Sequence, residues 1–276
     1  MRMMAPIGIF DSGYGGLTIL QGIRNRLPQY DYIYLGDNAR APYGTRSFDV
    51  VYEFTWQAVR TLFDKGCPLV ILGCNTASAK ALRTIQQTNL PAEAPDRKVL
   101  GVIRPTAEVI GHLTKTRHVG VLATEGTIKS GSYCMEIHKF FPDVVVTGQA
   151  CPMWVNLVEN NEFNKPGADY FVRDSLQQLF AQDPLIDCIL LGCTHFPLLL
   201  HKIRQHVPAG ITIMSQGGYI AESLEDYLNR HPEIAMRLSK GGSCQYFTTE
   251  SGSEFKNHAS VFLNSDVEAR RITLHS

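Results

Sequence analysis

The sequence contains a weak internal repeat, and this repeat constrains the fold more than any single motif does. Residues 7–13 (IGIFDSG) resemble 119–126 (VGVLATEG), and residues 70–76 (VILGCNT) resemble 190–195 (LLGCTH). In each copy an apolar run ends in small and polar residues, a pattern on which unrelated βα units also converge. We favour two related domains, with convergence as the alternative.

Short apolar runs alternate with amphipathic segments along the whole chain, a pattern typical of parallel α/β sheets. Apolar residues at helical spacing predict helices over 17–27, 47–63 and 76–87. Buried strands are predicted at 7–10, 30–35, 69–72, 99–103, 119–123, 144–147, 188–191 and 211–214.

The predicted fold class is therefore α/β, with two similar parallel-sheet domains. Pro91, Pro95 and the polar residues between them indicate a boundary near residue 98, and residues 208–210 indicate another near 209. We expect residues 1–98 with 210–276 to form the first domain and residues 99–209 to form the second.

Composition excludes several classes of function. Lys and Arg (26) balance Asp and Glu (26), so no overall field favours nucleic acid, and we expect no nucleic-acid partner. The apolar runs, such as 69–72 and 189–191, end far short of the ~18 residues of a membrane span, and we expect neither a span nor a signal peptide. Seven cysteines without a Cys-x-x-Cys pair argue against a disulfide framework and favour a reducing cytoplasm.

Two cysteines occupy repeat-equivalent positions. Cys74 and Cys193 each stand between a predicted buried strand and a predicted helix. A helix N-terminus stabilises a thiolate, so we expect a lowered pKa at these thiols. A single cysteine in such a place is more often a small buried apolar residue, but two equivalent ones favour a functional role. His195, two residues after Cys193, could hold or exchange a proton with it.

Two further loops follow predicted strands at the edge where parallel sheets bind ligands. The first, 11–16 (DSGYGG), lacks the Lys and the glycine spacing of phosphate-binding loops, and Asp11 could serve as a helix cap or as a functional carboxylate. The second, 37–44 (DNARAPYG), could equally be an ordinary surface turn. Glu159 ends an amphipathic stretch, where an exposed glutamate is common.

Two other uses of the thiols fit the sequence poorly. A cysteine phosphatase loop needs an arginine six residues after its nucleophile, where this chain has Lys80 and Leu199. Cys188, Cys193 and His195 could supply three zinc ligands, but their spacing is unusual and no second compact pair is present. We therefore expect no metal.

Taken together, five ordered motifs resemble the glutamate racemases of the cofactor-independent aspartate/glutamate racemase superfamily. The resemblance implies two α/β domains related by a pseudo-twofold axis, an active site in the cleft between them, and interconversion of L- and D-glutamate for peptidoglycan synthesis. The motifs cover most of the chain and are 10–17 (FDSGYGGL), 36–44 (GDNARAPYG), 73–79 (GCNTASA), 101–105 (GVIRP) and 192–199 (GCTHFPLL).

The resemblance also implies roles for individual residues. Cys74 and Cys193 match the two acid/base thiols, Asp11 and His195 match the groups that assist them, and Glu159 matches a family carboxylate through a weaker string. No cofactor is implied, and the oligomeric state, monomer or homodimer, stays open. The matching substrate-binding residues are Asp11, Ser12, Tyr43, Gly44, Asn75, Thr76, Thr194 and His195.

Two other functions remain as alternatives. An aspartate or hydantoin racemase would use the same paired thiols on another substrate. A binding protein without activity would keep the cleft and lose the chemistry.

Overall fold

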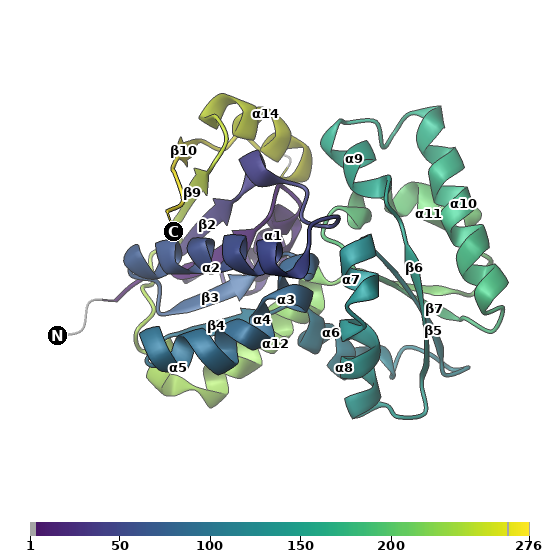
Figure 1. Cartoon of the computed structure of the whole chain (residues 1–276), viewed down its shortest axis with the longest axis horizontal. Helices are drawn as coiled ribbons and strands as arrows, with labels where there is room; N and C mark the ends of the chain where they lie inside the picture. The colour runs from purple at the N-terminus through teal and green to yellow at the C-terminus, as the bar shows by residue number, and fades with distance from the viewer. Residues whose placement is uncertain (1–3, 264, 276) are drawn as a thin grey trace.

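The computed structural model describes residues 4–263 and 265–275, and it folds into two lobes, each built on a parallel β-sheet (Figure 1). The strand order is β10-β9-β2-β1-β3-β4 in the first sheet and β6-β5-β7-β8 in the second. The strands are β1 (Ile7–Asp11), β2 (Tyr32–Gly36), β3 (Leu69–Leu72), β4 (Lys98–Gly101), β5 (His118–Ala123), β6 (Val145–Ala150), β7 (Cys188–Leu191), β8 (Thr212–Met214), β9 (Cys244–Thr248) and β10 (Ala269–Arg271).

The two sheets share one topology. The order β2-β1-β3-β4 in the first sheet is repeated as β6-β5-β7-β8 in the second, and every pairing is parallel. In this correspondence β1 is equivalent to β5 and β3 to β7, as the sequence repeat predicts. The α/β class with two similar parallel sheets is confirmed.

Helices connect the strands, with short 3-10 segments at η1 (Asn38–Arg40) and η3 (Phe196–Leu199) and a π-helical segment at η2 (Ile85–Asn89). The α-helices are α1 (Gly16–Arg26), α2 (Phe48–Asp64), α3 (Asn75–Lys80), α4 (Leu82–Thr84), α5 (Leu90–Glu93), α6 (Ile103–Ile110), α7 (Glu125–Lys129), α8 (Ser132–Phe140), α9 (Trp154–Glu159), α10 (Pro166–Gln182), α11 (Leu200–His206), α12 (Gly217–Arg230), α13 (Pro232–Ala235) and α14 (Gly252–Leu263). Within the described ranges, none of these helices has the length and apolar character needed to cross a membrane.

The central strands are buried on both faces. Every residue of β1, β2, β3 and β7 is buried, which is why these strands read as continuous apolar runs rather than as alternating ones. Successive side chains of β1 enter different cores: Ile9 packs in the cluster that contains Leu20 of α1, and Phe10 packs in the one that contains Leu62 of α2. The first sheet is therefore covered by helices on both sides.

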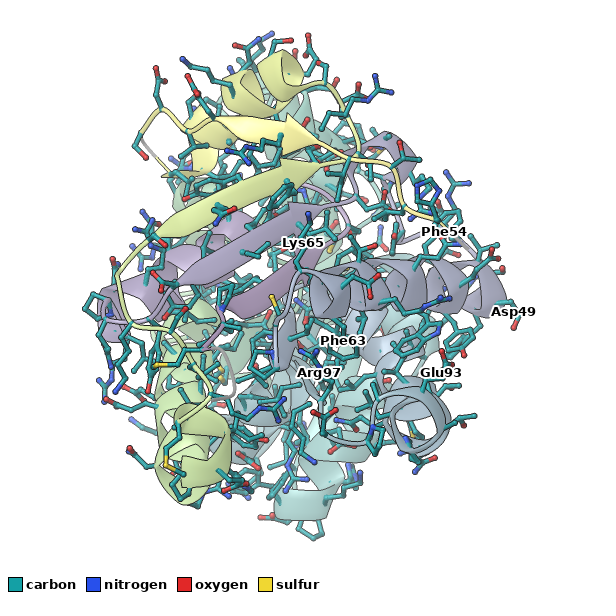
Figure 2. All side chains as sticks on the ribbon, turned by 90° about the vertical axis from the view of Figure 1, so that its left-hand side faces the viewer. Asp49, Phe54, Phe63, Lys65, Glu93 and Arg97 are labelled. Carbon is teal, nitrogen blue, oxygen red and sulfur yellow. The ribbon has the colours of Figure 1, made fainter. Side chains whose placement is uncertain are left out.

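Helix α2 shows how the sequence sets these boundaries. The Ser47 hydroxyl accepts a hydrogen bond from the backbone N–H of Val50 at 3.3 Å and so caps the first turn. At the other end, Arg97 lies over the ring of Phe63 at 5.6 Å and donates to the carbonyl of Cys67, which ties the start of β4 to the start of β3 (Figure 2).

Several predicted boundaries differ from the structure. The strand predicted over 99–103 ends at Gly101, and α6 begins at Ile103. The helix predicted over 76–87 is divided into α3, α4 and the π-helical turn η2. Strands β9 and β10 were not predicted, because β9 mixes polar and aromatic residues and β10 is three residues long. The division at residues 98 and 209 stays a prediction. Strand β4 of the first sheet begins at residue 98, and β8 of the second sheet lies wholly beyond residue 209.

Helix α12 follows the second sheet in sequence but packs against α1 of the first lobe. Close approach of these helices depends on Gly22, because an added Cβ there would lie 2.7 Å from the backbone carbonyl oxygen of Gly217. An exposed glycine one residue further along α12, Gly218, has nothing within 4 Å of an added Cβ.

We therefore expect Gly22→Ala to destabilise the protein, since overpacking costs about 1–3 kcal/mol, more than alanine gains in helix propensity. The melting temperature should fall by several degrees in a thermal unfolding scan. Gly218→Ala is the matched control and should leave the melting temperature unchanged or raise it. Equal melting temperatures for the two variants would contradict the close helix contact.

Candidate active site

Cys74 and Cys193 line one cavity between the two lobes. Cys74 follows β3 of the first sheet and Cys193 follows β7 of the second, so each thiol lies at the carboxyl end of its strand. The interior leaves about 20 Å³, room for about one water molecule. The lining residues are Ser12, Ala41, Pro42, Tyr43, Gly44, Cys74, Asn75, Thr76, Thr124, Val155, Glu159, Cys193, Thr194 and His195.

The structure thus brings all but one of the predicted site residues to this cavity. Asp11, the exception, is fully buried behind the wall at the end of β1. Sequence reasoning missed Thr124, although the repeat contains the signal, because 119–126 aligns with 7–13 and places Thr124 opposite Ser12.

The Cys74 thiol is held by two hydrogen bonds. Its Sγ lies 3.2 Å from the Ser12 hydroxyl and accepts from the backbone N–H of Ala77 at 3.4 Å. Burial raises the pKa of Cys74 to about 12, the Asp11 carboxylate adds to the rise, and the two hydrogen bonds only oppose it. The expectation of a lowered pKa at this thiol is wrong: α3 is one short helix, and the loss of water outweighs its N-terminal dipole. Cys74 is protonated at neutral pH.

Asp11 lies close enough to act on Cys74 electrostatically. Its Oδ2 accepts from the backbone N–H of Gly13 at 2.9 Å, and its Oδ1 is buried with no hydrogen-bond partner among the described residues. Burial raises the pKa of Asp11, an effect that the charge of His195 opposes. A buried carboxyl with a raised pKa can take up and release a proton.

Cys193 has a different environment, which is formed by His195, two residues further along the chain, and by Glu159, which is distant in sequence. Cys193 Sγ lies 3.7 Å from Nδ1 of His195, and Nε2 of His195 lies 3.0 Å from Oε1 of Glu159, the last residue of α9. Burial alone lowers the pKa of His195, but its hydrogen bonds to Cys193 and Glu159 outweigh burial and raise that pKa well above its usual value.

The loop 11–16 comes very near this group. A side chain at Gly15 would collide with Thr194 and with the His195 ring, so only glycine lets the first-lobe loop approach the second lobe here. Thr194 is further held because its carbonyl accepts from the Thr18 hydroxyl at 3.2 Å.

Tyr43 and Gly44 form another part of the wall. The Tyr43 hydroxyl donates to the buried carboxylate of Asp37, so it is already committed within the first lobe. The Gly44 carbonyl accepts from the backbone N–H of Gly126 at 2.8 Å, a direct hydrogen bond between the lobes.

Threonine hydroxyls add a second contact across the interface. Thr76 Oγ1 lies 2.9 Å from Oγ1 of Thr124 and 3.3 Å from Oγ1 of Thr127. Thr76 and Thr124 also line the cavity, so their buried hydroxyls can donate hydrogen bonds to a carboxylate bound there.

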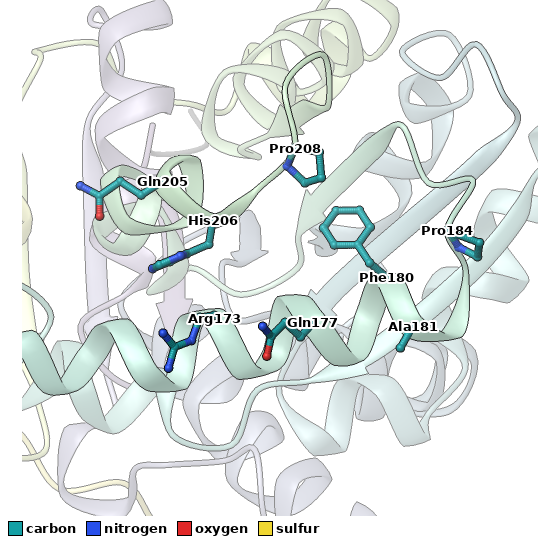
Figure 3. A pocket seen from close by; sticks show the side chains of 8 residues that line it. All are labelled: Arg173, Gln177, Phe180, Ala181, Pro184, Gln205, His206 and Pro208. Atoms are coloured by element: carbon teal, nitrogen blue, oxygen red, sulfur yellow. The ribbon is translucent and has the colours of Figure 1, made fainter.

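A wider cavity of about 630 Å³ lies between α10 and α11, far along the second lobe (Figure 3). Its walls include Arg173, Phe180 and His206, and it contains no cysteine. The acid/base groups converge instead on the small cavity between the lobes. Among residues 4–263 and 265–275, no three His, Cys, Asp or Glu side chains lie close enough together to hold a metal ion. Cys188, Cys193 and His195 therefore do not form such a group.

Comparison with known proteins identifies similar chains. The family model described as Asp/Glu/Hydantoin racemase matches residues 17–216. The chain is 37% identical to a glutamate racemase of Dinoroseobacter shibae, over 96% of this chain and 98% of that one. A glutamate racemase structure from Bacillus anthracis superposes with a TM-score of 0.88 at 33% identity, and one from Francisella tularensis in complex with D-glutamate with 0.86 at 29%, each covering 98% of both chains.

We expect Glu159→Gln to lower the pKa of His195, because the substitution removes the negative charge while burial of the ring still disfavours the imidazolium. A titration of the histidine ring resonances by NMR measures this pKa directly. The matched control is Glu162→Gln, since Glu162 forms an ion pair with the exposed Lys165. An unchanged His195 titration in Glu159→Gln would show that the carboxylate does not support the imidazolium.

Proposed function

The chain, an amino-acid racemase, belongs to the Asp/Glu/hydantoin racemase family, and we propose that it interconverts L- and D-glutamate with two thiols as its acid and base. The single observation that carries this proposal is the cavity lined from opposite lobes by Cys74 and Cys193. A two-base racemisation uses a base on one face of the α carbon and an acid on the other, and two opposed thiols supply both.

The two thiols have unequal surroundings. Cys193 Sγ lies 3.7 Å from Nδ1 of His195, which can exchange a proton with it, and Cys74 is a neutral thiol, because burial raises its pKa. In one direction Cys193 takes the α proton while the C–H electron pair stays on carbon, and the Cys74 S–H gives its proton to the opposite face. In the other direction the two roles exchange.

The second direction begins from a Cys74 thiolate, which must be formed in a buried site. Asp11 and Ser12 are the groups that assist: the Ser12 hydroxyl hydrogen-bonds Cys74, and Asp11 can accept the displaced proton. At the second thiol, His195 exchanges protons with Cys193, and Glu159 supports His195 through a hydrogen bond. Each thiol therefore has one partner that carries protons.

The carbanion formed in between needs electrostatic stabilisation, because an α proton is a very weak acid. The cavity has room for about one water molecule, and exclusion of water strengthens the hydrogen bonds that the hydroxyls of Ser12, Thr76 and Thr194 in its lining can donate to the substrate carboxylates. These residues, with Asn75 and the loop at Tyr43 and Gly44, are the proposed substrate-binding set, and the reaction requires no cofactor.

Glutamate is favoured over the alternative substrates by the relatives. The Dinoroseobacter relative is a glutamate racemase, and the Francisella structure holds D-glutamate. We further propose that the enzyme acts in the cytoplasm and supplies D-glutamate for peptidoglycan synthesis. An aspartate or hydantoin substrate is the alternative, and an assay of optical rotation with each candidate substrate separates the two.

We expect Cys74→Ala and Cys193→Ala each to lower racemisation of glutamate by about a thousandfold or more, because each removes the proton carrier on one face. Circular dichroism checks that the variants fold. Cys188→Ala is the matched control: Cys188 is a buried cysteine on the same strand as the Cys193 loop but outside the cavity, so turnover per folded enzyme should stay near wild type. Near-normal turnover in either cavity variant would sink the paired-thiol assignment.

The origin of the incoming hydrogen tests the mechanism most sharply. When L-glutamate reacts in deuterated water, the opposing thiol has already exchanged with solvent, so early D-glutamate should carry α deuterium while recovered L-glutamate stays mostly protiated. Starting from D-glutamate should give the mirror result. Mass spectrometry of the separated enantiomers at a few per cent conversion provides the measurement. Product that largely retains substrate protium would instead indicate one base serving both faces.

A further inference from the structure

Behind the cavity, three buried side chains from distant parts of the chain form a closed ring of hydrogen bonds. Asn75 Nδ2 donates to Oε1 of Gln216 at 2.8 Å, Gln216 Nε2 donates to the Tyr133 hydroxyl at 2.7 Å, and the Tyr133 hydroxyl donates to Oδ1 of Asn75. All three residues are at most 3% exposed. Asn75 begins α3 in the first lobe, Tyr133 lies in α8 of the second, and Gln216 directly precedes α12.

The direction of every bond in this ring follows from one backbone carbonyl. The Thr106 hydroxyl donates its hydrogen to the carbonyl of Val102 at 2.9 Å, so its oxygen can only accept from Gln216, at 2.9 Å. Gln216 must therefore turn its NH₂ group toward Thr106 and its carbonyl oxygen toward Asn75.

The same reasoning fixes Asn75. Because the Gln216 oxygen faces it, Asn75 must present its NH₂ group there and its own carbonyl oxygen to Tyr133. One amide hydrogen goes to Gln216, and the carbonyl oxygen is turned to the Tyr133 hydroxyl. Asn75 lines the cavity, so its second N–H is the donor that it has left for a ligand.

We propose that Thr106, Gln216 and Tyr133 are positioning residues that make Asn75 an N–H donor toward a substrate carboxylate, with the Val102 carbonyl setting the polarity. This inference deepens the proposed function and rests on it for the identity of the carboxylate. Without these hydrogen bonds, the Asn75 amide could turn either its oxygen or its NH₂ group to the cavity, and the oxygen could accept from an ammonium group. The ring of hydrogen bonds fixes one orientation of the amide.

Tyr133 also connects this donor to the second thiol loop. A Cβ added to Gly192, the residue before Cys193, would lie 3.0 Å from the Tyr133 ring. The aromatic ring of Tyr133 therefore packs against the Cys193 loop, while its hydroxyl holds Asn75, the residue after Cys74. Asn75 has its polarity set only while the two lobes are together.

The test uses racemic glutamate as the ligand, because racemisation leaves its composition unchanged during a calorimetric titration. Tyr133→Phe should raise the dissociation constant about fivefold to tenfold, as loss of one ordering hydrogen bond predicts. Tyr32→Phe is the matched control: Tyr32 is also buried, its hydroxyl donates to the Leu27 carbonyl at 2.7 Å, and it begins β2 at the sheet edge opposite the cavity.

Two further comparisons separate positioning from general loss of stability. In an Asn75→Ala background, Tyr133→Phe should have no additional effect on binding, since its action passes through Asn75. Thr106→Val, which keeps the shape but removes the accepting oxygen, should weaken binding about twofold to threefold, and Thr106→Ser should restore it. If Tyr133→Phe does not fold, the comparison of Thr106→Val with Thr106→Ser still tests the inference.

Wild-type affinity in Tyr133→Phe, an effect that persists without Asn75, or Thr106→Val and Thr106→Ser with equal affinities would overturn the inference. So would a wild-type protein that does not bind glutamate. Failure of the proposed function has a different signature, namely a wild-type protein that binds glutamate but never converts one enantiomer into the other.

Discussion

The site depends on one geometric constraint: in a parallel sheet, all strands end at the same edge. The loops that follow β1, β2 and β3 therefore gather at one edge of the first sheet, and the loops that follow β5 and β7 gather at one edge of the second. Because the two sheets have the same strand order and face each other across the lobe boundary, equivalent loops meet. Duplicating one cysteine loop is then enough to place a thiol on each side of a ligand.

The two halves differ where proton transfer requires it. Ser12 and Thr124 align in the repeat, and both remain hydroxyls, but Asp11 aligns with Ala123. Conversely, Thr76 aligns with His195 when the cysteines are superposed. The first half thus supports its thiol with a buried carboxyl beside it, and the second with an imidazole that needs Glu159 to hold its charge. The duplicated scaffold supplies the symmetry of the reaction, and these substitutions supply two unequal thiols.

Sequence patterns predicted the fold class, the repeat and the buried strands because these depend on local apolar periodicity. They did not predict β9, β10 or the π-helical turn, which are short or mixed in composition and are formed by packing with distant segments. The raised pKa of Cys74 was also missed, because a motif reports the helix N-terminus but not the amount of water that folding removes. The ring of Asn75, Tyr133 and Gln216 was invisible for a similar reason: its members are unremarkable polar residues until the lobes bring them together.

Burial and access impose opposite demands on this site. A cavity with room for about one water strengthens the electrostatics on which carbanion formation depends, but a molecule the size of glutamate cannot enter without movement of the walls. The contacts that join the walls across the lobes are the Gly44–Gly126 backbone hydrogen bond and the hydroxyl contacts of Thr76 with Thr124 and Thr127. Each is a neutral hydrogen bond with a net value of about 1 kcal/mol, weak enough to exchange for contacts with a charged ligand. The hydroxyls of Thr76 and Thr124, which join the lobes and line the cavity, are therefore available to bind substrate carboxylates.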